Sequence, residues 1–464
     1  MKRKLLGRHG SITVFLCVIL SAMIILESIY IEGAYKRKRE VVLAQAVSHQ
    51  VEQILSQFDR NLLTWYGVYA ISDVKQGSAV FDRMTKSIEN TSFSYALTGE
   101  FDNNALRSSI LDFMRLRVIA FEGNAILEQL GVSISDIRSK NISGKGLSSW
   151  MPTFHTLLDN KKYVSGILDK LRGMIKDSGF GDKVDTFNEF LDDARMAWEE
   201  KSSSVIELGD SSASVSMFDP TSISSLTSMF DTYMDADLPG FVDRMIMNEY
   251  AAFQFDSRID TYITTDGFKP EKNMTGVAFT DIHGENKSDL EYLLIGSDHE
   301  WVNHAAVDGI LFGTRLILDF GSFMMDEAKK QTALIIAEVM ALIIALISAG
   351  TVIIDPFSIQ YAILFIMAYI RAITDTAKLI NGQSVPIFYN DKVISTLGGF
   401  AYADYRDYFR VLLLFVPENW LLSRMRTVIE RDAGKTLYTG VKGIGTLEGT
   451  PYVIERRCDL YADN

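Results

Sequence analysis

The chain opens with a continuous run of apolar positions that charged residues bracket on both sides. Residues 12–31 are almost wholly apolar, and they lie between the basic residues of positions 2–8 and a second basic cluster at 36–39. Twenty residues of α-helix are about 30 Å long, which matches the hydrocarbon core of a bilayer. The pattern therefore predicts a transmembrane helix at 11–35, preceded by a basic leader at 1–10.

The apolar run is expected to stay on the protein as an anchor. A signal peptidase site needs small residues directly behind the run, whereas positions 27–32 are bulky and charged. Attachment of a lipid to Cys17 would need a small residue where Leu16 stands. The positive-inside rule does not orient the anchor, because four Lys or Arg lie on each side of it.

Between position 40 and about position 72, apolar residues fall on one helical face, with the period of an amphipathic helix. Spaced by 4, 3, 4, 4 and 3 positions, they are Val47, Val51, Ile54, Phe58, Leu62 and Trp65. No proline precedes Pro152, so the anchor and this stretch can form one helix. Two interpretations stay open: an anchor followed by an ordinary domain helix, or one long helix that packs against copies or partners.

The rest of the chain is predicted to form three regions. Residues 36–200 have helical patterns and are interpreted as a helical extracytoplasmic region, including one or two helices at 104–130. Residues 201–230 are interpreted as a flexible linker, because eleven serines fall within 27 positions. Residues 231–464 are interpreted as an α+β region.

The α+β region combines short strand-like runs with helices. The runs lie at 261–264, 277–280 and 291–295, and a helix is expected from 302 to 330. The C-terminal forty residues alternate with glycine punctuation, which predicts an antiparallel strand pair. The predicted fold class is therefore mainly α with a small antiparallel β component, led by the long N-terminal helix.

A second hydrophobic region at 333–371 predicts a helical hairpin with Asp355-Pro356 at its turn. Its arms contain sixteen and fourteen uncharged residues, fewer than the roughly 17–25 that a spanning helix needs. A buried αα-hairpin is favoured over a transmembrane hairpin. In both alternatives the segments before and after the hairpin lie on the same side of the membrane.

Net charge and cysteine content restrict the classes of partner and of structure that the chain can have. Residues 1–40 contain eight Lys or Arg and three Asp or Glu, so they carry +5 of a chain total of −13. The remainder carries −18, which argues against nucleic acid or anionic lipid as a partner of the body. The only two cysteines, Cys17 and Cys458, provide no disulfide framework.

Motifs for chemistry are weak in this sequence. His299 and His304 lie five positions apart, whereas two zinc ligands on one helical face need a spacing of four. They are expected to be a surface histidine and a capping or packing histidine. No catalytic residue, cofactor-binding residue or metal ligand is predicted, and we do not expect an enzyme.

Two acidic residues of the anchor, Glu27 and Glu32, stand out, because a carboxylate inside an apolar run is costly unless it is paired or near an interface. The favoured interpretation places both at the outer membrane interface, beside Tyr30 and Tyr35. The alternative is that one of them pairs with a partner helix or a terminal amine in an assembly.

The N-terminal run from Gly10 through the basic cluster resembles Tad-pilus pseudopilins of the TadE/TadG kind. In that group a basic leader ends in Gly, and a transmembrane helix with an acidic-Gly exit follows. The resemblance makes Gly10-Ser11 the prepilin-type processing junction and Glu32-Gly33 the exit. Phe15 is a departure from the pattern, because such junctions usually carry Glu at that position.

The fuller chain is similar to an uncharacterised Gram-positive (Firmicute) family of domain-of-unknown-function proteins found with Tad-like secretion components. The matching pieces are 10–15, 241–255, 290–296 with Asn303 and Arg315, and 402–415. The resemblance implies a membrane-anchored extracytoplasmic component of a Tad or type IV-like pilus, without catalytic residues.

The expected protein therefore has a single anchor in the cytoplasmic membrane and an acidic, mainly helical body outside it. Its expected partners are the membrane and pilus-assembly or pseudopilin-like proteins, which it would meet through helix packing. The alternatives are a membrane-tethered extracellular sensor or ligand-binding protein and a membrane-bound hydrolase. A sensor would need an intracellular signalling segment, and a hydrolase would need a convergent polar pocket.

Overall fold

The computed structural model contains two compact units of mostly helical structure with a small antiparallel sheet, as the sequence predicts. Unit 1 comprises Met1–Phe113 and Arg426–Asn464, and unit 2 comprises Met114–Met425. Apart from a few isolated positions between 126 and 170, the residues that the structure describes are 9–114 (without 73, 75 and 76), 178–204, 241–259, 288–389 (without 349 and 352) and 401–458.

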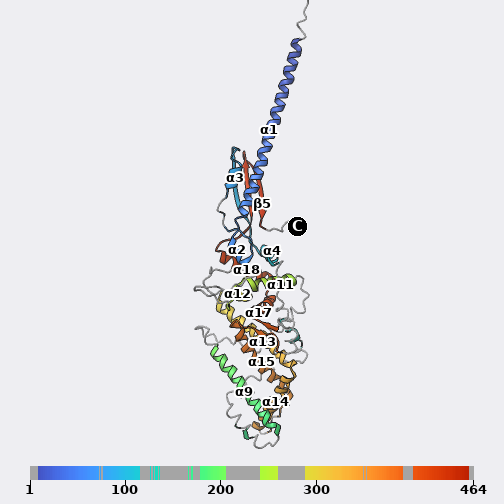
Figure 1. The fold of residues 1–464 in the computed structure, drawn as a ribbon, viewed down its shortest axis with the longest axis vertical. Helices are drawn as coiled ribbons and strands as arrows, with labels where there is room; N and C mark the ends of the chain where they lie inside the picture. The colour runs from blue at the N-terminus through green and yellow to red at the C-terminus, as the bar shows by residue number, and fades with distance from the viewer. Residues whose placement is uncertain are drawn as a thin grey trace, which may run out of the picture. The chain divides into compact units, whose positions relative to one another are not determined.

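Unit 1 begins with α1 (His9–Leu55), a single helix of 47 residues (Figure 1). The predicted anchor and the start of the amphipathic stretch therefore form one helix. The helix ends at Leu55, however, so the apolar positions from Phe58 to Trp65 do not continue its amphipathic face as predicted. The side chain of Asp59 accepts hydrogen bonds from two backbone N–H groups and caps a new helix, α2 (Arg60–Tyr66).

The sheet of unit 1 has the strand order β1-β4-β5 and is antiparallel throughout. The predicted C-terminal strand pair is confirmed, as β4 (Tyr438–Leu447) and β5 (Thr450–Arg457). The strand β1 (Thr91–Glu100) lies where only helix was predicted, so that prediction is wrong there. Its partner β4 lies more than 300 positions away, and no local pattern reveals such a pairing. Unit 1 also contains the helices α3 (Ala79–Met84) and α4 (Asn103–Met114) and the C-terminal part of α18 (Glu418–Ala433).

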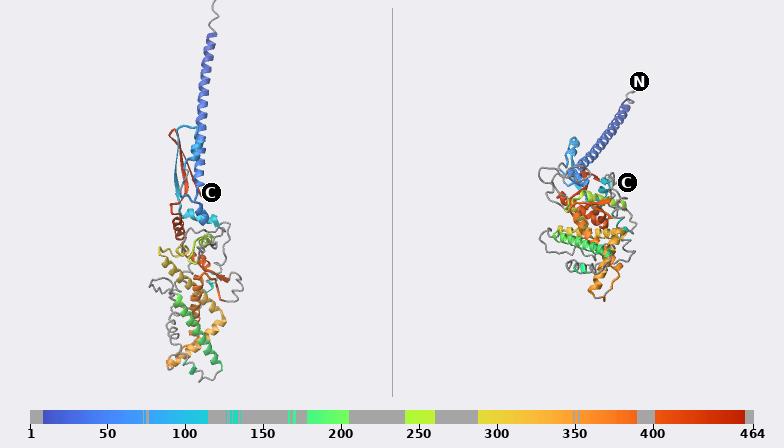
Figure 2. Two further views of the ribbon diagram at one scale, coloured as in Figure 1. Left: turned by 60° about the vertical axis from the view of Figure 1, so that its left-hand side comes forward. Right: turned by 60° about the horizontal axis from the view of Figure 1, so that its bottom comes forward.

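The C-terminal half of α1 lies along one face of this sheet (Figures 1 and 2). Two glycines of β4 permit the close approach. A Cβ atom on Gly443 would come within 2.5 Å of Val51 Cγ2, and one on Gly445 would come within 2.3 Å of Val47 Cγ2. The glycines that punctuate the C-terminal sequence therefore make room for a helix, in addition to shaping turns.

Unit 2 is built around three helices that pack on one another, α13 (Glu300–Met325), α14 (Glu327–Ile347) and α15 (Pro356–Ile380). A further helix, α9 (Ser178–Ser204), packs against α14 and α15. The smaller elements are α11 (Phe241–Gln254), α12 (Asp289–Ile295), β2 (Val385–Pro386), β3 (Tyr402–Ala403), α17 (Tyr405–Leu412) and η4 (Leu413–Phe415). The helix α18 (Glu418–Ala433) follows them in the chain.

Two local predictions within this region are wrong. Residues 291–295, expected as a strand, belong to α12, which ends at Gly296 with a φ of 81°. A short apolar run does not distinguish a buried strand from a buried helix. The helix expected over 302–330 is interrupted at Asp326, which is extended and whose side chain caps the first turn of α14. The runs at 261–264 and 277–280 and positions 205–230 of the predicted serine-rich linker lie outside the described residues. Positions 201–204 of that linker belong to α9, so the linker prediction is wrong there.

The hydrophobic hairpin predicted at 333–371 consists of α14 and α15. The two helices pack on each other, and α13 and α9 pack against them. Glu338, the charge that precedes the first apolar arm, forms an ion pair of 2.5 Å with Lys183 of α9. These contacts agree with the buried hairpin that the sequence favours.

Candidate functional site

The four site residues predicted from the sequence lie on α1. Gly10 and Ser11 belong to its first turns, and their side chains are outside the described part of the chain. Glu27 and Glu32 are exposed on the same helix. Among the described residues neither of them forms a hydrogen bond or an ion pair, so their role in an assembly stays a prediction.

The two halves of α1 have different surroundings. The described side chains from Thr13 to Lys38 are all exposed, including apolar ones such as Ile29, which is 64% exposed. From Leu43 onwards one face of the helix is buried among residues of the sheet and of α3. Among the described residues, α1 is the one helix that is long and apolar enough to cross a membrane.

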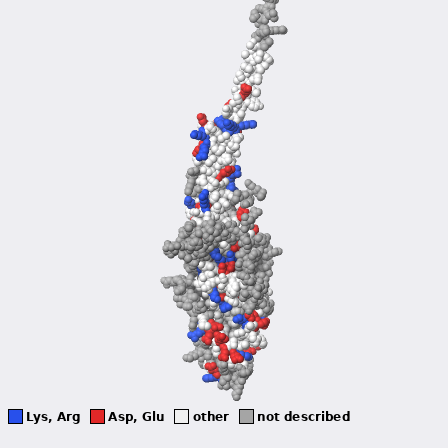
Figure 3. Space-filling view, in the orientation of Figure 1, with Lys and Arg blue, Asp and Glu red and all other residues white. Residues whose placement is uncertain are grey.

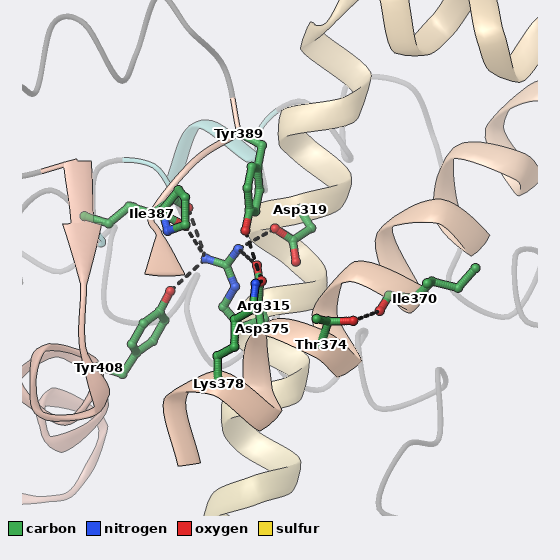
Figure 4. Close-up of polar contacts among 10 residues, drawn as sticks. Arg315, Asp319, Ile370, Thr374, Asp375, Lys378, Ile387, Tyr389 and Tyr408 are labelled. Carbon is green, nitrogen blue, oxygen red and sulfur yellow. Dashed lines mark hydrogen bonds and ion pairs between the residues drawn. The ribbon is translucent and has the colours of Figure 1, made fainter. Parts of the chain in front are cut away.

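A second feature, in unit 2, is a buried charge cluster around Arg315 of α13 (Figure 4). The Arg315 side chain is fully buried, and its Nη2 donates to Asp319 at 2.5 Å and to Asp375 at 2.7 Å. Asp319 lies one turn further along α13, whereas Asp375 comes from α15. One guanidinium thus joins two carboxylates from two helices.

The other terminal nitrogen of Arg315 binds neutral acceptors from the segments that follow α15. Its Nη1 donates to the carbonyl oxygens of Pro386 and Ile387 at 2.9 and 3.3 Å, and to the hydroxyl of Tyr408 at 2.8 Å. The planar five-donor geometry of arginine makes such a many-sided contact possible. Arg315 therefore ties α13, α15, β2 and α17 together.

Further groups complete the cluster around Asp375. The hydroxyl of Tyr389 donates to Asp375 Oδ1 at 3.0 Å, and the ammonium of Lys378 lies 4.0 Å from the same oxygen. The guanidinium of Arg371 lies 4.0 Å from the centre of the Tyr389 ring, which is a cation–π distance. Lys378 is half-exposed and Arg371 is exposed, so the cluster reaches solvent through these two residues.

The surroundings of Asp319 in this cluster raise the pKa of its carboxyl group. Burial raises the pKa of the Asp319 carboxyl, Arg315 opposes that effect, and the neighbouring Asp375 adds to it, with a net rise to about 8. The Oδ2 atom of Asp319 is buried and has no hydrogen-bond partner. A proton on Asp319 fits this environment, because a fully buried carboxyl beside the charge of Asp375 is costly to ionise.

A second buried network links α12, α13 and α17. Arg258 forms an ion pair with Asp308, and the hydroxyl of Tyr405 donates to Glu291 at 2.7 Å. The guanidinium of Arg258 also lies 3.9 Å from Glu291. Burial raises the pKa of Glu291, and the hydrogen bond from Tyr405 partly offsets that rise.

The polar groups of both networks chiefly bind one another. Among the described residues, no group of three or more His, Cys, Asp or Glu has a geometry that could hold a metal ion. His299 is exposed at the N-cap position of α13 and its side chain makes no capping hydrogen bond, whereas the half-buried His304 lies 2.6 Å from the hydroxyl of Ser288. The pair thus consists of one surface and one packing histidine, as predicted. The arrangement that the structure describes is that of buried cross-links between helices.

Sequence reasoning missed both networks. Arg315 entered only as part of a resemblance, and Asp319 and Asp375 were not singled out. A signal was present, because Arg315 and Asp319 are charged positions four apart within the apolar C-terminal half of α13. Their partner on α15 lies 56 positions beyond Asp319, so the pairing itself required the tertiary structure.

Comparison with known proteins gives one match. Residues 188–441, more than half of the chain, match the model of a family described as a family of unknown function (DUF5702). The matched region begins within α9, contains both buried networks and ends within β4, so it leaves out α1. No curated protein and no solved structure matches the chain.

Proposed function

The chain belongs to the DUF5702 family, whose function is unknown, and we therefore propose a role from its own structure: a membrane-anchored, non-catalytic structural protein. In this proposal α1 crosses the cytoplasmic membrane once, and the rest of the chain lies outside it. The role is to hold a folded body at the membrane and to join an assembly of similar proteins.

The division of α1 into two halves carries this proposal. An uninterrupted helix connects an exposed apolar half with a half that is buried against the sheet of unit 1. Exposed apolar side chains along such a length would be costly in water, and a bilayer removes that cost. Since no flexible joint separates the two halves, the anchor and the sheet would move as one body.

The non-catalytic part of the proposal rests on the buried networks. Perturbed carboxylates often mark active sites, but ion-pair networks perturb them as well. Here Asp319, Asp375 and Glu291 bind a guanidinium or a tyrosine hydroxyl of unit 2. Such groups stabilise helix packing rather than a bound substrate.

The finer assignment is to a Tad or type IV-like pilus, as a minor pseudopilin-like component. Its support is the resemblance of the N-terminal run, with Gly10-Ser11 as a processing junction and Glu32-Gly33 as the exit. The continuous helix that follows the junction suits side-by-side packing of anchors in a membrane.

N-terminal sequencing of the protein from the membrane fraction tests the processing step. Ser11 as the first residue would support cleavage of a prepilin-type leader, whereas an intact Met1 would refute it and leave a plain anchor. Protease treatment of intact cells tests the orientation, because only an extracytoplasmic body is digested from outside.

Site-specific photocrosslinking tests the assembly role. Benzoylphenylalanine replaces Tyr30, which is 75% exposed on the anchor, and in a control it replaces Trp301, which is 57% exposed in unit 2. We expect the Tyr30 position to capture proteins that carry a similar leader and apolar helix. Adducts to lipid alone at Tyr30 would contradict helix-mediated assembly while leaving the anchor in place.

A further inference from the structure

Four consecutive basic residues encircle α1 at the point where its exposed half ends. We call Lys36, Arg37, Lys38 and Arg39 the basic collar. Figure 3 shows blue side chains gathered on α1 where the white, apolar stretch of the helix gives way to the sheet. Burial begins at Leu43, about 6 Å further along the helix axis.

The collar lies where a membrane surface would be. Thr13 to Tyr35 span 23 residues, or about 34 Å of helix, close to the thickness of a bilayer core. Tyr30 and Tyr35, the aromatic residues just before the collar, are 75% and 63% exposed, as is typical of residues at the membrane interface. The collar therefore follows directly on the apolar segment, at the level of the lipid headgroups.

Three of the four cations are available to a ligand. Arg39 donates to Glu448 of the β4–β5 turn at 2.8 Å, so the protein itself neutralises its charge. Lys36, Arg37 and Lys38 are exposed, and no ion pair occupies them among the described residues. The nearby acidic residues, Glu32 and Glu40, are exposed as well and form no ion pair with the collar.

The directions of these three side chains discriminate between ligands. Successive residues of an α-helix are about 100° apart, so Lys36, Arg37 and Lys38 point to directions that span about 200° around the axis. A single partner helix would contact one side of α1 and leave part of this set in solvent. A layer of lipid headgroups surrounds the helix and reaches all three cations at once.

We propose that the basic collar binds the phosphate groups of anionic phospholipids in the outer leaflet and so fixes the height of unit 1 above the membrane. This inference rests on the proposed membrane anchor and adds the class of lipid that the anchor selects. Within residues 1–40 the positive charge is confined to the leader and the collar, and the rest of the chain is strongly acidic. Attraction of anionic lipid is therefore expected at these two basic segments and not over the body of the protein.

The test measures lipid selectivity of the full chain reconstituted in phosphatidylcholine vesicles. Electron spin resonance of spin-labelled phosphatidylglycerol and phosphatidylcholine gives the ratio of their association with the protein. All proteins carry K2Q/R3Q/K4Q/R8Q, which removes the contribution of the leader. Flotation with the vesicles comes first, since a chain that fails to float contradicts the proposed anchor rather than the collar.

At low salt we expect phosphatidylglycerol to be preferred about five-fold, which corresponds to about one cation–headgroup interaction. The preference should fall towards one in 1 M salt, where the Debye length shrinks to about 3 Å. K36Q/R37Q/K38Q should abolish it. The matched control R39Q/E448Q removes a pair that neutralises itself and should leave the preference unchanged.

Two results would overturn the inference. One is a chain that floats but shows the same lipid ratio with and without the three collar cations. The other is a K36Q/R37Q/K38Q protein with an unchanged lipid ratio but weaker association between its copies or with its partners, measured by energy transfer. That result would mean that the collar binds a protein instead of lipid. Because all three side chains are exposed, circular dichroism should show an unaltered fold in the variant.

Discussion

Replacing Asp319 by asparagine should remove a large part of the pH dependence of the stability of unit 2. In the folded chain, burial and the neighbouring Asp375 hold the pKa of Asp319 near 8, above the value of about 4 for an unfolded aspartate. Between these two values the folded state keeps a proton that the unfolded state has lost. The free energy of unfolding of the native protein therefore falls as the pH rises through this window, by about 1.4 kcal/mol per pH unit.

The variant D319N has no proton to lose, so its stability should lack this slope. Its amide oxygen can still accept from Arg315. Its amide group, however, brings two N–H donors to a position where the protonated carboxyl of the native protein has one O–H, and the oxygen at that position has no partner. A buried unpaired donor costs about 1–3 kcal/mol. We therefore expect D319N to be the less stable protein near pH 4, to match the native protein near pH 5–6, and to be the more stable one at pH 8.

Pulsed hydrogen exchange of peptides from α13 and α15 across a urea series measures this effect, because it reports on unit 2 separately from unit 1. The control is D298N, which removes an exposed carboxylate from the same unit. We expect D298N to follow the native protein at every pH. Parallel pH profiles for the native protein and D319N would refute the assignment of a proton to Asp319 in the folded protein.

Two further substitutions test the packing of each unit. R315M leaves the charge of Asp375 buried without its closest cation and removes the hydrogen bond to Asp319, so we expect a loss of about 3–5 kcal/mol in the unfolding free energy of unit 2, measured by the same exchange experiment. G445A places a methyl group within 2.3 Å of Val47, so urea unfolding of unit 1 should show a loss of about 1–3 kcal/mol. The control G33A adds the same methyl group where no atom lies within 4 Å, and an unchanged stability in G445A would contradict the tight packing of α1 on β4.

Local patterns predicted the parts of the fold that depend on neighbouring residues. The long apolar N-terminal helix, the hydrophobic hairpin and the β4–β5 pair each follow from a period or a turn signal within about forty positions. The predictions that were wrong also have local causes. A short apolar run at 291–295 fits a strand or a helix equally well, and a single capping residue, Asp326, divides what looked like one helix.

The candidate sites divide in the same way. The sequence located the long apolar segment, its acidic residues and its basic flanks, because they lie on one continuous stretch of chain. The length of that stretch can be compared directly with the thickness of a bilayer. It gave no sign that Arg39 is neutralised by Glu448, which lies 409 positions away, and that pairing decides which collar cations remain available.

By itself the sequence thus determined the length and apolar character of the N-terminal helix, the mainly helical class and the acidic charge of the remaining chain. Only the tertiary structure decided that β1 joins β4, that glycines of β4 admit α1, and that Arg315 gathers Asp319 and Asp375. The physical reason is that hydrophobic periodicity constrains one element at a time. Strand pairing and buried charge pairing depend instead on which distant elements meet, and a single sequence does not record those contacts.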